Sequence, residues 1–123
     1  MKQVMIVGAG GFIGTILRYK LGGFVFHHTP NWKFPLGTVL INIFGCLAAG
    51  LLAGLAEKQD FFTADTRLFL FIGLIGGFTT FSAFGMETVY LIQRHEIWHA
   101  VLNVVISVSF GLLALWLGLK ATA

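Results

Sequence analysis

The sequence predicts an all-α membrane protein with four transmembrane helices, the third of which is broken near the middle of the membrane. Hydrophobic residues make up 57% of its 123 residues and charged residues 11%, whereas about 25% are charged in a typical soluble domain. A soluble protein of this length buries too little surface to hide so much apolar area. Four apolar stretches are each long enough to cross a bilayer core, which needs roughly 20 helical residues. We therefore expect residues 1–123 to form a single four-span membrane domain.

The first span is expected over residues 4–26. Its beginning, VMIVGAGGFIG, has the glycines of a nucleotide-binding loop, but such a loop needs an acid about 20 positions later. The first acid of the chain is Glu57, so this alternative is not favoured. Gly10 and Gly14 instead place small residues on one helix face, where helix backbones can approach closely. Arg18 continues this spacing near one end of the span, and it either anchors to lipid headgroups or faces a water-filled vestibule.

The second and fourth spans, residues 35–56 and 97–119, each carry a strip of polar and small side chains. Residues at these spacings stack on one helix face, so each strip faces one direction. Strips of this kind either hold neighbouring helices together by hydrogen bonds or line a polar pathway. The strips are Thr38, Asn42, Gly45 and Ala49 in the second span, and His99, Asn103, Ser107 and Gly111 in the fourth.

The third span, residues 67–93, contains two glycines and two threonines at which we expect the helix to break, near residues 76–80. Glycine loosens the backbone, and threonine supplies hydroxyl groups that satisfy freed backbone groups. A break exposes partially negative carbonyl groups and partially positive amides, and discontinuous membrane helices bind ions in this way. Phe81 and Phe84 project from one side of the second half, with ring edges that favour an anion. Glu87 is the only acid well inside a span, which makes it a candidate functional group, and the alternative is a location at the membrane interface, since Gln93 and Arg94 follow it closely.

The polar breaks between the spans are short, so consecutive helices are expected to be antiparallel neighbours. Lys and Arg normally decide which way a chain inserts, but here the two sides of the membrane receive four each. The tie favours insertion in both orientations, with two copies paired as an antiparallel, dual-topology homodimer. The alternative is a single orientation set by one or two dominant charges. The residues counted are Lys2, Lys58, Arg67 and Lys120 on one side, and Arg18, Lys20, Lys33 and Arg94 on the other.

Composition disfavours several other classes of function. The formal charge of +3 is spread over loops and helix ends, and no basic cluster indicates binding to nucleic acid. Cys46 is the single cysteine, so a disulfide within the chain is excluded, and we interpret it as a buried structural thiol. No nucleophile with an adjacent base and no cluster of metal ligands suggests catalysis, so we do not expect an enzyme.

Three segments of the chain resemble motifs of the CrcB/Fluc fluoride channel family. GGFTTFSAFGME, residues 76–87, is similar to the signature of that family, GTVLIN at 37–42 to its second-helix motif, and GGFIGTILRY at 10–19 to its first-helix motif. The resemblance runs through essentially the whole chain. It implies passive, fluoride-selective efflux that confers fluoride resistance, through two pores of an antiparallel, dual-topology homodimer. It also implies a multi-pass protein of the plasma membrane, which is the inner membrane in bacteria, with the lipid bilayer and fluoride as partners.

The resemblance also implies roles for individual residues. A structural sodium ion, which is not transported, would be held by the backbone carbonyls of Gly76 and Thr79 from both subunits. Phe81 and Phe84 would line the pores, and Asn42 would supply the pore amide. Arg18 corresponds to a vestibule arginine of the first-helix motif. Further residues on the polar path would be Thr38, Thr80, Ser82, Glu87 and Ser107.

Three positions depart from the pattern of the family. Ala83 replaces a residue that usually carries a hydroxyl group, Asn103 stands where tyrosine is common, and Gly111 stands where serine is common. We expect transport to survive these differences, although the hydrogen-bond route along the pore must differ. The alternative function is a proton-coupled exporter similar to the small multidrug-resistance proteins, which also have four spans and dual topology. Those proteins depend on a glutamate in the first helix, and the first span here contains no acid.

Overall fold

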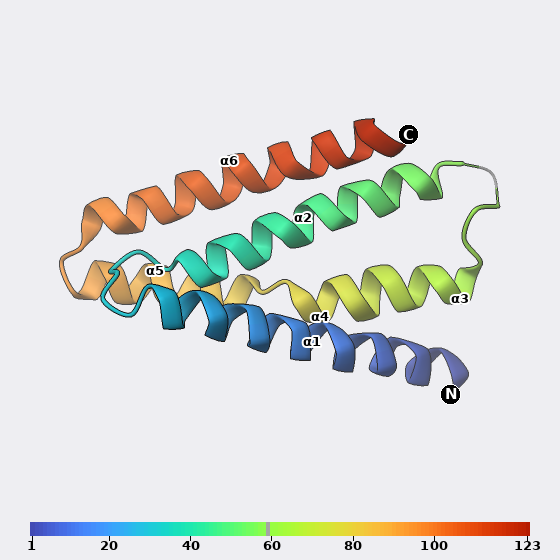
Figure 1. The fold of residues 1–123 in the computed structure, drawn as a ribbon, viewed down its shortest axis with the longest axis horizontal. Coiled ribbons are helices and arrows are strands. Elements are labelled where there is room, and N and C mark those ends of the chain that lie inside the picture. Colours follow the sequence, from blue (N-terminus) through green and yellow to red (C-terminus); the bar gives the residue numbers. More distant parts are fainter. Residues whose placement is uncertain (59) are drawn as a thin grey trace.

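The computed structural model describes residues 1–58 and 60–123, and every regular element within them is a helix. The first and second spans are α1 (Lys2–His28) and α2 (Leu36–Ala56). Four helical runs are long and apolar enough to cross a membrane (Figure 1), which confirms the prediction of an all-α protein with four such helices. The third span consists of α3 (Ala64–Arg67), the π-helix η1 (Leu68–Ile75), α4 (Gly76–Phe78) and α5 (Phe81–Gln93), and the fourth is α6 (Ile97–Thr122).

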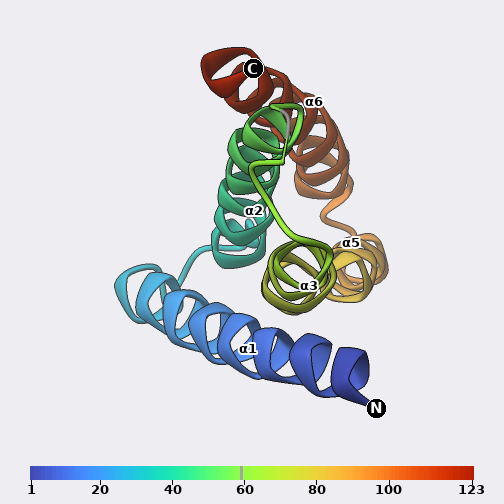
Figure 2. The same cartoon turned by 90° about the vertical axis from the view of Figure 1, so that its right-hand side faces the viewer.

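Consecutive helices run in opposite directions, but the closest packing is between helices that are not consecutive. α1 packs along η1 and α4, and α2 packs along α6. Along each of these two contacts, residues later in one helix meet residues later in the other, so the paired helices run parallel. Seen end-on, the third span lies between α1 on one side and α2 with α6 on the other (Figure 2). The expectation of antiparallel neighbours therefore holds for direction but not for the main packing partners, because glycines decide which helices approach most closely.

Glycines allow α1 to lie directly on the backbone of the third span. A Cβ atom at Gly77 would lie 2.7 Å from the carbonyl oxygen of Gly11, and one at Gly14 would overlap the carbonyl oxygen of Leu74. Interiors are packed too tightly to absorb such overlaps, so a larger residue at either position would force the helices apart. The four-residue spacing of Gly10 and Gly14 thus corresponds to a packed face, as the sequence predicts.

α2 and α6 meet through glycines in the half of each helix that is nearer its C-terminus. A Cβ atom at Gly118 would lie 2.7 Å from the carbonyl oxygen of Leu47. One hydrogen bond crosses the same contact, since Oγ1 of Thr122 donates to the carbonyl oxygen of Leu51 at 2.7 Å. Backbone lies against backbone here, which leaves little room for polar side chains between the two helices.

Two extended residues separate α4 from α5. Thr79 has φ −84° and ψ 157°, Thr80 has φ −150° and ψ 111°, and the helix resumes at Phe81. Oγ1 of Thr80 caps the new helix by accepting a hydrogen bond of 3.2 Å from the amide of Ala83. The sequence predicts the helix break near residues 76–80, yet both glycines of this segment remain helical. Gly77 serves the close approach of α1, and the threonines alone form the extended segment.

Ion pairs tie the helices together at both ends of the molecule. Nζ of Lys2 lies 2.7 Å from Oδ2 of Asp65 and joins the start of α1 to the start of the third span. Nζ of Lys33 lies 2.6 Å from Oε1 of Glu96 and joins the α1–α2 connection to the start of α6. All four residues lie outside the apolar middle of the spans, where charged side chains can remain hydrated.

Candidate functional site

Asn42 of α2 holds the extended segment of the third span in place. Its Nδ2 donates a hydrogen bond of 2.9 Å to the carbonyl oxygen of Thr80, and its Oδ1 accepts one of 2.8 Å from the amide of Thr80. An extended residue between helices has a free donor and a free acceptor, and a side-chain amide offers the matching pair. We call this pair of hydrogen bonds the Asn42–Thr80 clamp. Gly45, one turn farther along α2, provides the space, because a Cβ atom there would overlap the methyl group of Thr79.

Within the described part of the chain, two carbonyl groups beside the clamp are free, those of Gly76 at the start of α4 and of Thr79 just after it. Since the amide of Thr80 donates to Asn42, it is not available to the carbonyl of Gly76 four residues earlier. Among the described residues, no hydrogen bond ends on the carbonyl oxygen of Gly76 or of Thr79. Free carbonyls at the C-terminal end of a helix carry partial negative charge. Such carbonyl oxygens are hard ligands of the kind that alkali cations prefer. In residues 1–58 and 60–123, no group of three or more His, Cys, Asp or Glu side chains is placed to hold a metal ion.

The two phenylalanines of α5 open onto a cavity of about 330 Å³, which we call the aromatic cavity. The ring centroids of Phe81 and Phe84 are 5.5 Å apart, and Phe81 is 83% exposed. Cys46, interpreted from the sequence as a buried thiol, is only half-buried and lines this cavity. The aromatic cavity thus collects side chains from α2, the extended segment, α5 and α6. Predicted site residues in its lining are Asn42, Thr79, Thr80, Phe81, Phe84 and Ser107.

Arg18 borders a second cavity of about 300 Å³, the arginine cavity, which lies between α1, α2 and the start of α5. Thr80 lines this cavity as well as the aromatic cavity. Thr38 lines it on the α2 side, and Ala83 lines it on the α5 side. At Ala83 the lining beside Thr80 therefore has a methyl group and no hydroxyl group.

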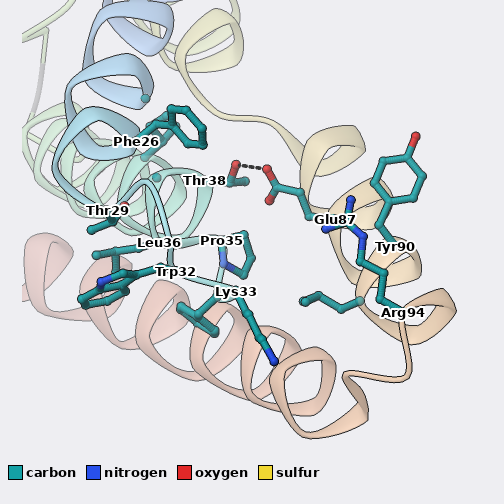
Figure 3. Close-up of a pocket in the computed structure, with 15 residues that line it drawn as sticks. Phe26, Thr29, Trp32, Lys33, Pro35, Leu36, Thr38, Glu87, Tyr90 and Arg94 are labelled. Carbon is teal, nitrogen blue, oxygen red and sulfur yellow. Dashed lines mark hydrogen bonds between the residues drawn. The ribbon is translucent and has the colours of Figure 1, made fainter.

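A third cavity of about 450 Å³, the loop cavity, opens at the end of the molecule where α1 and α2 are connected (Figure 3). Thr38 lines both this cavity and the arginine cavity. Its Oγ1 donates a hydrogen bond of 2.7 Å to Oε1 of Glu87, whereas Oε2 of Glu87 is buried without a partner in the described part of the chain. Lys33 and Arg94 also line the loop cavity and bring positive charge to it. Thr38 and Thr80 thus place the arginine cavity next to each of the other two.

The Lys33 ion pair stands beside the loop cavity and includes a histidine. Glu96 accepts from Nζ of Lys33 through Oε1, and its Oε2 lies 3.1 Å from Nδ1 of His99. The hydrogen bond from Lys33 holds the pKa of the Glu96 carboxyl below its usual range. This carboxylate therefore stays ionised at neutral pH and ties the α1–α2 connection to α6.

A chain of hydrogen bonds connects α6 to the backbone carbonyl of Phe84. Nδ2 of Asn103 donates to Oγ1 of Thr88 at 2.9 Å, and Oγ1 of Thr88 donates to the carbonyl oxygen of Phe84 at 2.7 Å. Oγ of Ser107 donates to Oδ1 of Asn103 at 3.4 Å. The sequence strip on the fourth span contains Asn103 and Ser107, but sequence reasoning missed Thr88. Its position four residues after Phe84, on the helix face that meets the strip, was the available signal.

Two predicted site residues lie apart from the cavities. Ser82 is exposed and lines none of the three, although its Oγ lies 3.4 Å from Oγ1 of Thr80. Gly76 is exposed at the start of α4, and no hydrogen bond from the described residues ends on its carbonyl oxygen. All other predicted site residues border at least one of the three cavities.

Comparisons with known proteins agree on one family. A profile described as "CrcB-like protein, Camphor Resistance (CrcB)" matches residues 5–119. The fluoride-specific ion channel FluC of Methylobacillus flagellatus is 48% identical over 120 residues, which cover 98% of this chain and 94% of that protein. FluC 1 of Methanosarcina acetivorans is 42% identical over 118 residues, which cover 96% of this chain and 88% of that protein. FluC of Flavobacterium psychrophilum is 42% identical over 119 residues, which cover 97% and 95%.

Proposed function

The chain belongs to the CrcB-like family of multi-pass membrane proteins, and from this premise we propose that it is a channel that conducts fluoride passively out of the cell. The observation that carries the proposal is the aromatic cavity, in which Asn42, Phe81 and Ser107 meet from three different spans. Polar groups inside an apolar bundle cost free energy unless they serve packing or an ion. Here they lie around an open space, as an ion pathway requires.

The residues around the aromatic cavity can replace part of the water that fluoride loses. Nδ2 of Asn42 has two hydrogens, and only one is used in the Asn42–Thr80 clamp, so the other can point to an anion. Thr80 lines the cavity and shares one hydroxyl contact with Ser82, which does not line it, so one of their two hydroxyl hydrogens stays available. The positive ring edges of Phe81 and Phe84 add weak attraction. Conduction requires sites that are strong enough to admit the ion and weak enough to release it, and a few neutral donors beside weakly positive ring edges suit this balance.

Arg18, Lys33 and Arg94 give the proposed path an attractive entrance. Arg18 lines the arginine cavity, and Lys33 and Arg94 line the loop cavity together with Glu87. Positive side chains raise the local concentration of anions at a cleft, and here they outnumber the one carboxyl group. Glu87 acts at the next step. Its carboxylate engages the hydroxyl hydrogen of Thr38, so an anion that passes must exchange with this hydrogen bond. In our proposal the path thus runs from the loop cavity through the arginine cavity to the aromatic cavity.

We extend the proposal to an antiparallel, dual-topology homodimer with two pores. The equal division of Lys and Arg between the two sides supports it. Phe81, which is 83% exposed beside a polar cavity, supports it too, because a second copy would close the open side. Gly76 and Thr79 would then supply carbonyl oxygens from each copy to a structural sodium ion placed between the copies. A bound sodium ion would neutralise the partial negative charge at the ends of both α4 helices. In this arrangement the extended segment lies near the middle of the membrane.

A proton-coupled exporter of the small multidrug-resistance kind is not favoured. Such a mechanism needs a membrane-embedded acid in the first helix, and α1 contains none. The relatives reported above are named as ion channels.

The experiment that tests the proposal measures fluoride efflux from loaded liposomes with a fluoride electrode, and chloride efflux in parallel. We expect rapid fluoride release without chloride release, independent of an imposed pH gradient. Phe81→Ile should abolish fluoride release, since it removes the ring edge from the aromatic cavity. The matched control is Phe12→Ile on α1, where Phe12 is 70% exposed and borders none of the three cavities. Equal release of chloride, or undiminished flux in Phe81→Ile, would contradict the proposal.

A further inference from the structure

Asn103 is the side chain that the proposed pathway leaves unexplained. It is 1% exposed, and it is the one fully buried large side chain in the described part of the chain. A buried amide is retained only where its donors and acceptors are matched. Asn103 finds its partners in Thr88 on α5 and Ser107 on α6, and Ser107 lines the aromatic cavity. The buried amide thus sits directly behind a side chain that faces the proposed ion path.

The direction of each hydrogen bond around Asn103 follows from the number of hydrogens available. Thr88 has one hydroxyl hydrogen and donates it to the carbonyl oxygen of Phe84 at 2.7 Å. Thr88 can therefore only accept from Asn103, which must turn its Nδ2 toward Thr88 and its Oδ1 toward Ser107. Ser107 then has to donate its own hydrogen to Oδ1 of Asn103. The hydroxyl hydrogen of Ser107 therefore points at Asn103 rather than into the aromatic cavity.

This orientation determines what Ser107 offers to an anion. With its hydrogen directed at Asn103, the hydroxyl group of Ser107 presents lone pairs to the aromatic cavity, and lone pairs repel fluoride. An anion that binds Ser107 must draw the hydrogen away and leave Oδ1 of Asn103 buried without a partner, which costs free energy. The hydrogen bond from Ser107 to Asn103 is 3.4 Å long and therefore weak, so an anion can draw the Ser107 hydrogen away from Asn103.

We propose that Asn103 is a positioning residue of the ion path, which holds the Ser107 hydrogen away from the cavity and so weakens anion binding there. The inference rests on the proposed function and deepens it. A site that binds fluoride loosely releases it quickly, which a channel needs for rapid conduction. Thr88 takes part because its bond to Phe84 fixes which way the amide of Asn103 faces.

The test measures fluoride flux over a range of fluoride concentrations and separates the half-saturating concentration from the maximal rate. Asn103→Leu keeps the approximate shape of the side chain but removes the acceptor for Ser107. We expect the half-saturating concentration to fall roughly threefold to tenfold, which corresponds to one hydrogen bond gained by the anion. The maximal rate should fall as well, because release becomes slower. Adding Ser107→Ala to Asn103→Leu should remove the shift and restore the half-saturating concentration of Ser107→Ala alone.

A second variant keeps the test valid if Asn103→Leu does not fold. Thr88→Val has the same shape as the native residue and leaves Asn103 in place, but it frees the amide to face either way. We expect a shift of the half-saturating concentration in the same direction and of smaller size. A merely structural role would lower thermal stability and maximal rate and leave the half-saturating concentration unchanged.

The outcomes separate this inference from the proposed function. Fluoride flux in the native protein, with unchanged half-saturation in both the Asn103 and the Thr88 variants, overturns the role of Asn103 alone. A shift that persists after Ser107→Ala also overturns it, because the effect then does not pass through the Ser107 hydrogen. A native protein that carries no fluoride overturns the proposed function, and the role of Asn103 falls with it.

Discussion

Replacing Asn42 by aspartate would test the polarity of the proposed ion path with almost no change in shape. The Asn42–Thr80 clamp uses Oδ1 as an acceptor and Nδ2 as a donor, and Asn42→Asp keeps the first and removes the second. The lost hydrogen bond costs about 1 kcal/mol of stability. The larger effect is on the anion, because a carboxylate about 5 Å from fluoride at an effective dielectric constant near 20 repels it by about 3 kcal/mol. We therefore expect fluoride flux to fall roughly a hundredfold.

The assay is the liposome efflux measurement, with size-exclusion chromatography and a thermal melt of each purified variant. The control is Gln3→Glu, which introduces the same charge at the exposed start of α1, where it borders none of the three cavities. Solvent and salt screen a charge there, so flux should stay within about twofold of the native value. If Asn42→Asp folds normally and conducts within a few-fold of the native protein, Asn42 does not face the ion and the reasoning is wrong.

Three further predictions concern packing, pH and sodium. Gly14→Ala should destabilise the protein to denaturant by about 1–3 kcal/mol, since the added Cβ overlaps the backbone of Leu74, whereas Gly8→Ala, with nothing within 4 Å, should not destabilise it. The lowered pKa of Glu96 means that its bond to Lys33 contributes stability above the ordinary carboxyl pKa of about 4.3 and loses it as the pH falls further. Thermal melts should therefore show a larger loss on acidification for the native protein than for Glu96→Gln, and equal losses would contradict this assignment. Exchanging sodium for a large organic cation should reduce fluoride flux reversibly, and unchanged flux would remove the proposed sodium ion.

The sequence predicts the number of spans well because a long apolar stretch has few alternatives to a membrane helix. It predicts less about which helices pack together. Gly10 and Gly14 reveal a face made for close approach, but a small residue fits any partner backbone equally well. The structure places this face on the third span rather than on α2, the next helix along the chain.

The candidate site, too, could be predicted only in part from the sequence. Polar residues inside an apolar stretch, such as Asn42 and Thr80, can be recognised in the sequence because a buried polar group costs free energy unless it has a partner. The clamp between them depends on the extended geometry of Thr80, which appears only when the fold brings α2 beside the third span. Thr88 was missed because a threonine that bonds to the carbonyl four residues earlier is ordinary in a helix. The role of Gly77 was misassigned because a glycine used for packing and one used for bending look alike in sequence.

The molecule has two unlike ends. Toward Thr38 and Glu87, polar side chains bond from helix to helix, whereas toward Gly118 the contact between α2 and α6 is mostly backbone against backbone, with one hydrogen bond from Thr122. In the proposed antiparallel homodimer, each side of the membrane would have the polar end of one copy and the tightly packed end of the other. The two sides of the dimer would then be equivalent for ion transport. Such an assembly cannot rectify. Its current should be the same at equal and opposite voltages, and the direction of net flow would be dictated by the electrochemical gradient alone.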